Sequence, residues 1–140
     1  MPDTTTRATV DAYLAHLDVG DIDGALELLA EPVDWDLPGS EIVPWVGRRS
    51  TRAEIATFFA LLDRHLVLEE FVVSQVLVDG PDAVVIGHLR DTVKATGETL
   101  RTWFSIHFTV LDGKITRYHF YEDSHAVAVA LEPAVGGVTR

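Results

Sequence analysis

Apolar residues in the first part of the chain recur every three to four positions, which is the spacing of a helix. Thr6–Asp18 follows this pattern, and Gly20 supplies a stop signal. A second, short helix is predicted behind Asp21 as its N-cap. The apolar stripe of this second helix is Ile22, Ala25, Leu26 and Leu29. Val33–Leu37 alternates as a short strand, residues 39–50 form a loop, and Thr51–Glu54 has the capping-box spacing that begins a third helix.

From Val67 onward the pattern changes to β-branched and aromatic runs that turn residues interrupt. We expect four strands and a last helical segment, at 67–78, 83–94, 98–110, 114–122 and 124–131. The short connections between the strands require antiparallel neighbours. The predicted fold is therefore α+β, with N-terminal helices packed on one face of a curved antiparallel sheet. Residues 1–140 are expected to form one domain, with a frayed tail at 133–140.

Strand alternation assigns side chains to faces once the turns are fixed. The core face of strand 98–110 is Thr102, Phe104, Ile106, Phe108 and Val110. A two-residue Asp112-Gly113 turn would place Ile106 beside His119, whereas a three-residue loop that includes Leu111 places it beside Tyr118. The second register brings aromatic residues together and is preferred.

A similar three-residue loop at 95–97 would bring His88 beside Phe104 and Arg90 beside Thr102, on the inner face. With Glu122, these side chains would place polar groups at one end of an apolar face. An apolar cavity with a few convergent polar groups is typical of a small-molecule site.

Composition narrows the possible partners. The 140 residues include 11 basic and 22 acidic side chains, so the net charge is -11, and there is no cysteine. This charge argues against binding of nucleic acid or anionic lipid, and the lack of cysteine excludes disulfides and thiol chemistry. The first 30 residues are too acidic for a signal peptide, and no apolar run is long enough for a membrane span. We therefore expect a soluble, cytoplasmic protein.

Three segments resemble the NTF2-like superfamily, which includes ketosteroid isomerase and the SnoaL-like polyketide cyclases. They are residues 13–26, the stretch from Asp36 to Ser40 with Gly47 behind it, and 112–115 leading into 121–123. The resemblance spans about residues 6–131. It implies a cone-shaped domain with a deep pocket between helices and curved sheet. It also implies dimerisation through the outer sheet face.

The resemblance to ketosteroid isomerase places the tyrosine oxyanion donor on Tyr13 and the aspartate base on Asp36. The second oxyanion donor falls on Ile106, which cannot donate a hydrogen bond. The catalytic positions of limonene epoxide hydrolase fall on His88, Arg90 and Phe120, so that machinery is absent. The acid and histidine of SnoaL-like cyclases have candidates in Asp36 or Glu122 with His88.

Each of these residues also has a purely structural interpretation. Asp36 could be a solvated turn carboxylate, Tyr13 a core residue, and Arg90 a salt-bridge partner of Glu122. Asp123 is better placed as an N-cap than as a catalytic acid. Trp35 and Trp45 are expected to close the cavity as an apolar wall or lid.

The opposite sheet face is predicted to carry an aromatic and imidazole cluster of Trp103, His107, His119 and Tyr121. A metal site of His107 with His119 has no third ligand at a suitable spacing, so no metal is expected. A homodimer interface explains the cluster more simply.

The predicted function is binding of a small, largely apolar or carbonyl-bearing molecule between helices and sheet. One form of it is a cofactor-independent acid/base isomerase, cyclase or dehydratase, with Asp36 as base and Tyr13 and His88 as hydrogen-bond donors. The predicted substrate-contacting residues are Arg90, Glu122, Tyr118, Phe104, Ile106, Phe120, Trp35 and Trp45. Two alternatives stay open: a non-catalytic ligand-binding protein, and an interaction domain with a vestigial pocket.

Overall fold

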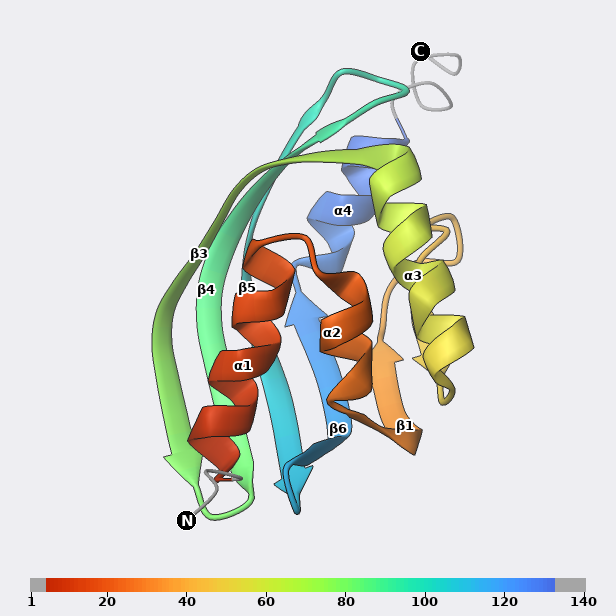
Figure 1. Cartoon of the computed structure of the whole chain (residues 1–140). Coiled ribbons are helices and arrows are strands. Elements are labelled where there is room, and N and C mark those ends of the chain that lie inside the picture. The colour runs from red at the N-terminus through yellow and green to blue at the C-terminus, as the bar shows by residue number, and fades with distance from the viewer. Residues whose placement is uncertain (1–4, 133–140) are drawn as a thin grey trace.

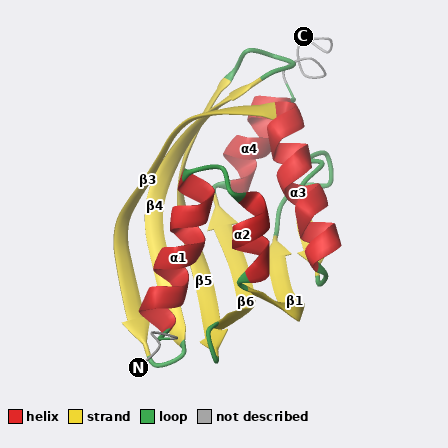
Figure 2. Cartoon of the chain, in the orientation of Figure 1, coloured by secondary structure: helices red, strands yellow, loops and turns green. Residues whose placement is uncertain are grey.

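The computed structural model describes residues 5–132 and shows helices packed against one face of a strongly curved sheet (Figures 1 and 2). The helices are α1 (Thr6–Asp18), α2 (Ile22–Glu27), α3 (Arg52–His65) and α4 (Ser124–Leu131). The strands are β1 (Leu29–Leu37), β2 (Gly47–Arg49), β3 (Leu66–Asp79), β4 (Asp82–Val93), β5 (Thr99–Leu111) and β6 (Lys114–Glu122). The sheet order is β2-β1-β6-β5-β4-β3. The predicted α+β class is confirmed.

Helix starts follow the predicted caps. The Asp21 side chain accepts a hydrogen bond from the Gly24 N–H and begins α2, and Thr51 forms a complete capping box with Glu54 at α3. Asp123 caps α4 through its bond from the Ala126 N–H. Each cap satisfies backbone donors that a helix leaves unpaired at its first turn.

The sheet is mixed, which corrects the prediction of an antiparallel sheet. β3 to β6 are antiparallel neighbours, but β1 runs parallel to β6. These two strands are joined by no short loop, so the argument from connection length does not apply to them. The predicted loop at 39–50 also contains a short strand, β2, which pairs with the end of β1.

The β5–β6 turn has two residues, not the predicted three. Asp112 and Gly113 both have positive φ, and Leu111 pairs with Lys114. A bulge then shifts the register by one residue, so that Ile106 pairs with Phe120 and not with Tyr118. The predicted faces of both strands survive, because the error in register is two residues and side chains alternate with a period of two.

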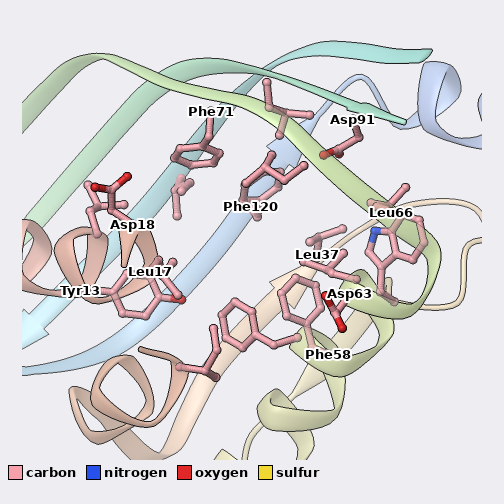
Figure 3. A pocket seen from close by; sticks show the side chains of 18 of the residues that line it. Tyr13, Leu17, Asp18, Leu37, Phe58, Asp63, Leu66, Phe71, Asp91 and Phe120 are labelled. Atoms are coloured by element: carbon pink, nitrogen blue, oxygen red, sulfur yellow. The ribbon is translucent and has the colours of Figure 1, made fainter. Parts of the chain in front are cut away.

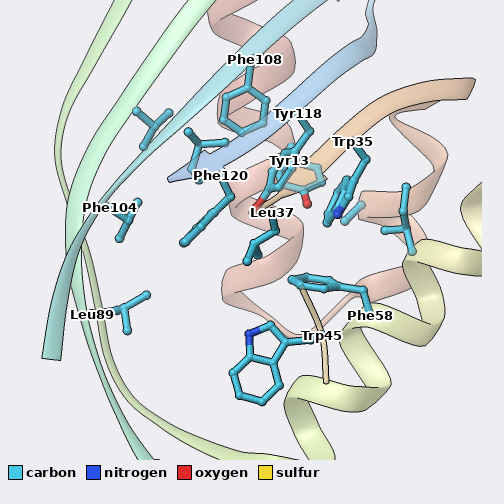
Figure 4. Close-up of a cluster of buried hydrophobic side chains, with 14 of the residues drawn as sticks. Tyr13, Trp35, Leu37, Trp45, Phe58, Leu89, Phe104, Phe108, Tyr118 and Phe120 are labelled. Carbon is cyan, nitrogen blue, oxygen red and sulfur yellow. The ribbon is translucent and has the colours of Figure 1, made fainter. Parts of the chain in front are cut away.

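The core lies between the helices and the inner face of the sheet (Figure 4). Trp35 stacks on Tyr118 with 3.9 Å between ring centroids, and Phe58 meets Trp35 edge-on at 5.1 Å. The predicted core face of β5 is confirmed, since Thr102, Phe104, Ile106, Phe108 and Val110 are all buried. This aromatic cluster fixes α3 against the β1–β6 side of the sheet.

Within residues 5–132, none of the helices combines the length and the hydropathy that a membrane crossing requires. The tail predicted to fray, 133–140, lies outside the described residues.

Candidate functional site

A cavity of about 1140 Å³ opens between the helices and the inner face of the sheet (Figure 3). Its wall is mainly apolar and aromatic. α1 contributes Tyr13 and Leu17, α3 contributes Phe58 and Leu62, and the sheet contributes Phe120. This volume exceeds the range of ordinary small-ligand sites, so a drug-sized molecule would fit.

The cavity reaches the edge strand β3. Leu68, Phe71 and Val73 line it from β3, yet each remains partly exposed. The β3–β4 register shifts twice, between Leu68 and Glu70 and between Val73 and Gln75. Bulges of this kind bend a strand, and the bent strand curves the sheet away from the helices. The opening therefore follows from how β3 pairs with β4.

Six predicted site residues do line this cavity. They are Tyr13, Trp45, Ile106, Tyr118, Phe120 and Glu122. Their positions match the predicted inner face and the predicted apolar wall, while their roles toward a substrate stay predictions. Ile106 lines the cavity as predicted, so the wall offers no side-chain hydrogen-bond donor at that point.

The structure places Asp36 outside the cavity. It follows the buried Trp35 on β1, so its side chain points to the outer face, where Arg48 lies 3.6 Å away. Trp35 itself and Phe104 are buried in the core and do not line the cavity either. The predicted base and these two predicted contacts are therefore corrected: strand alternation separates Asp36 from the apolar side, and aromatic neighbours enclose the two rings.

His88 and Arg90 also lie on the outer face, and the prediction that they line the pocket is wrong. His88 pairs with Trp103 and Arg90 with Arg101. The reason is the length of the β4–β5 loop. A backbone hydrogen bond from the Val93 N–H to the Glu98 carbonyl oxygen closes the loop, so it contains four residues, whereas three were predicted. One extra loop residue turns every β4 side chain to the opposite face.

The same change of register brings Asp91 to the cavity, where the sequence interpretation had no candidate. Asp91 is 6% exposed, lines the wall, and makes no side-chain hydrogen bond within residues 5–132 (Figure 3). Its neighbours across the strands are Leu68 and Leu100. The signal in the sequence was the alternation Val85, Gly87, Leu89, Asp91, Val93, which the assumed loop length assigned to the wrong side.

Two carboxyl groups on the cavity wall have raised pKa values. Burial, with a smaller effect from the charge of Glu69, raises the pKa of Asp91 to about 6. Burial followed by the charges of Asp91 and Asp123 raises the pKa of Glu122 to about 7. Both groups therefore exchange a proton near neutral pH, as an acid/base catalyst must.

Two phenols also line the cavity, and Tyr118 interacts electrostatically with Glu122. Tyr13 is fully buried, and within the described residues its hydroxyl completes no hydrogen bond of ordinary geometry. Burial, reinforced by the neighbouring Tyr118 hydroxyl, holds the pKa of Tyr13 well above its usual range, and burial does the same for the pKa of Tyr118. Both phenols stay protonated; the Tyr13 hydroxyl is closed off from the cavity, which leaves the Tyr118 hydroxyl as the donor that a ligand oxygen could reach.

The outer face carries the predicted aromatic and imidazole cluster. Trp103 is 65% exposed and Tyr121 is 47% exposed. His107 pairs with Asp82 and His119 with Asp34, each with 2.9 Å between nitrogen and oxygen. In the part of the chain that the structure describes, no three His, Asp or Glu side chains come together as a metal site.

Comparison with known proteins places this chain in a family. The model of the SnoaL-like domain matches residues 10–118. No curated protein matches the sequence.

Solved structures with similar folds cover nearly the whole chain. An NTF2-like protein from Burkholderia thailandensis E264 is 21% identical with a TM-score of 0.84, over 92% of this chain and 98% of that one. TerC, co-crystallised with polyporic acid, is 24% identical with a TM-score of 0.80, over 91% and 98%. A protein of Xanthomonas campestris pv. campestris, provisionally called a polyketide cyclase, is 24% identical with a TM-score of 0.71, over 90% and 96%. The family match, over most of the length of a chain with this fold, shows that the protein belongs to the SnoaL-like domain family within the NTF2-like fold.

Proposed function

We propose that this protein binds a small, largely apolar molecule in the cavity and transfers a proton to or from it, as a cofactor-independent isomerase, cyclase or dehydratase does. The observation that carries the proposal is the pair of carboxyl groups, Asp91 and Glu122, on the wall of a large apolar cavity. An unpaired buried carboxyl group lowers the free energy of unfolding, and groups of this kind are found mainly at functional sites.

Glu122 is the proton-transferring group. Its pKa of about 7 is the closer of the two to neutrality, so both of its protonation states are populated at physiological pH. As a carboxylate it removes a proton from the carbon next to a substrate carbonyl, and as the acid it returns a proton to the enolate at another atom. The hydroxyl of Tyr118, with Tyr13 packed behind it, donates a hydrogen bond to the enolate oxygen.

The similarity to a structure called a polyketide cyclase supports this reaction class, because cyclisation and isomerisation of polyketones both begin with enolate formation. The open cavity supports ligand binding over a vestigial pocket, because its aromatic side chains line the space and do not fill it.

Proton exchange in D2O tests the reaction without a known substrate. The probe is 2-tetralone, an apolar enolisable ketone whose loss of α-protons is followed by NMR. We expect the protein to accelerate exchange, with a rate that rises with pH through about 7 as Glu122 ionises. Glu122→Gln should lower the enzymatic rate by about 100-fold or more.

The matched control is His88→Ala, which removes a titratable side chain from the outer face and should leave the rate unchanged. Exchange that survives in Glu122→Gln would show that another group moves the proton. Tight binding of 2-tetralone with no exchange in the wild-type protein would favour the non-catalytic binding protein.

We also propose that two copies pair through the outer sheet face. The support is the exposure of Trp103 and Tyr121, while the imidazoles of His107 and His119 on that face already pair with Asp82 and Asp34. Trp103→Glu should convert a dimer to a monomer in sedimentation velocity. Val19→Glu, at an exposed apolar residue that follows α1 and lies away from the sheet face, is the control and should remain dimeric. A wild-type monomer at the same concentration would contradict the proposal.

A further inference from the structure

Every charged side chain on the cavity wall is acidic. Within residues 5–132 they are Asp11, Asp18, Asp63, Asp91 and Glu122, and the lining includes no Lys, Arg or His. Asp11 is exposed and pairs with Arg7 at 3.2 Å. Apolar and aromatic side chains make up most of the remainder. The cavity therefore combines a mainly apolar wall with charged groups that are all acidic, and these groups would repel an anionic ligand.

Among these groups Asp91 is buried and has no hydrogen-bond or ion-pair partner in the part of the chain that the structure describes. It is 6% exposed, and its cross-strand neighbours Leu68 and Leu100 are apolar. Lys94, three residues further along the chain, donates from its ammonium to the Asp63 carbonyl oxygen at 2.6 Å. Arg90 and Arg101 are cross-strand neighbours, and both lie on the opposite face of the sheet. Among the described residues, no Lys, Arg or His forms an ion pair or a hydrogen bond with Asp91.

The groups that face Asp91 from the surrounding elements add negative charge. Glu69 of β3 and Glu122 of β6 both interact with it electrostatically. Asp63 of α3 lines the same cavity. His65, at the end of α3, packs against Trp45 and is not part of the wall. A positive charge placed next to Asp91 would therefore be stabilised by several carboxylates at once.

We propose that the ligand of this cavity is a largely apolar molecule carrying a protonated amine, and that the amine binds the Asp91 carboxylate. An ionised carboxylate only accepts hydrogen bonds, so its missing partner must be a donor, and a cationic donor also offsets its buried charge. The inference rests on the proposed function, because it names the class of molecule that the same cavity takes. Asp91 then holds the ligand while Glu122 transfers the proton.

The test compares three probes that share one ring system and differ in charge: 1-naphthylmethylamine, 1-naphthalenemethanol and 1-naphthoate. Affinities are measured by ligand-observed NMR titration at pH 8.5, where Asp91 and Glu122 are ionised. We expect the amine to bind about tenfold or more tightly than the alcohol, and the carboxylate to bind most weakly. At pH 5, where both groups are protonated, the preference for the amine should shrink.

Two variants and two controls locate the effect. Asp91→Asn, and separately Asp91→Leu, should lower the affinity for the amine to about that of the alcohol and leave the alcohol's affinity unchanged. Asp112→Asn removes the same charge at the β5–β6 turn, where Asn tolerates the positive φ, and should keep the preference. Ala56→Trp places a bulky ring on the cavity wall and should weaken all three probes.

Equal affinity for the amine and the carboxylate at pH 8.5 would overturn the proposal, as would a preference that survives both Asp91 variants. Failure of all three probes to bind would overturn it as well. These results are independent of the 2-tetralone exchange experiment. An enzyme that acts on neutral ligands would accelerate that exchange but would show no preference for the amine here.

Discussion

The two faces of the sheet hold carboxyl groups in opposite electrostatic settings. On the outer face, Asp34 accepts hydrogen bonds from His119 and Arg117, and the bond from His119 leads the effects that lower its pKa. On the inner face, Asp91 and Glu122 have no such partner among the described residues, and burial raises their pKa values. The residue types and the strands are comparable, so the presence or absence of a donor decides the direction of each shift.

This difference distinguishes a structural carboxylate from a candidate functional one. A paired surface carboxylate stabilises the fold modestly and is satisfied without a ligand. An unpaired carboxyl group in an apolar cavity destabilises the fold whenever it is ionised, until a ligand arrives. The inner face therefore carries a cost that the outer face does not, and stability measurements can detect it.

The largest expected effect is on the inner face. In the folded state both pKa values lie above those of the unfolded chain, so the native protein binds these protons more tightly and loses stability as pH rises through about 4 to 7. The double variant Asp91→Asn with Glu122→Gln removes this loss. It should raise the free energy of unfolding at pH 8 by about 3 kcal/mol, a figure already reduced for solvent in the cavity, with little gain at pH 4.

Urea denaturation at the two pH values measures this gain. Asp112→Asn, which removes a carboxyl group from an exposed turn, is the comparison variant and should show no such gain. If the double variant changes the free energy of unfolding by the same amount at pH 4 and pH 8, then ionisation of the two groups does not destabilise the folded state.

A smaller effect of opposite sign is expected on the outer face. Asp34→Asn leaves His119 and Arg117 without their carboxylate and should lower the free energy of unfolding at pH 7 by about 0.5–1 kcal/mol. Because the folded pKa of Asp34 is depressed, its contribution is present above its ordinary pKa and is lost as pH falls through the folded value. Denaturation at pH 7 and near pH 2.5 checks both statements; a variant more stable than the wild type at pH 7 would contradict the contrast between the faces.

Much of the fold could be predicted because it depends on local patterns. Helical spacing predicted α1 and α3, side-chain chemistry predicted the caps at Asp21, Thr51 and Asp123, and alternation predicted the core face of β5. These features need only residues a few positions apart. The parallel pairing of β1 with β6 joins distant segments, and no local pattern indicates it.

The candidate site was predicted only in part, because it depends on register. Tyr13, Tyr118, Phe120 and Glu122 were placed on the wall correctly, since their own elements fix their faces. His88 and Arg90 were placed there wrongly, and Asp91 was missed, because a loop one residue longer reverses β4.

The sequence by itself determined which segments become helices and strands, which family the chain resembles, and that its charge is acidic. Only the tertiary structure decided which acids face the cavity and which meet a cation on the far side of the sheet. The physical reason is that secondary structure responds to neighbours along the chain, whereas the partner of a carboxyl group depends on strand register and on segments that folding brings together.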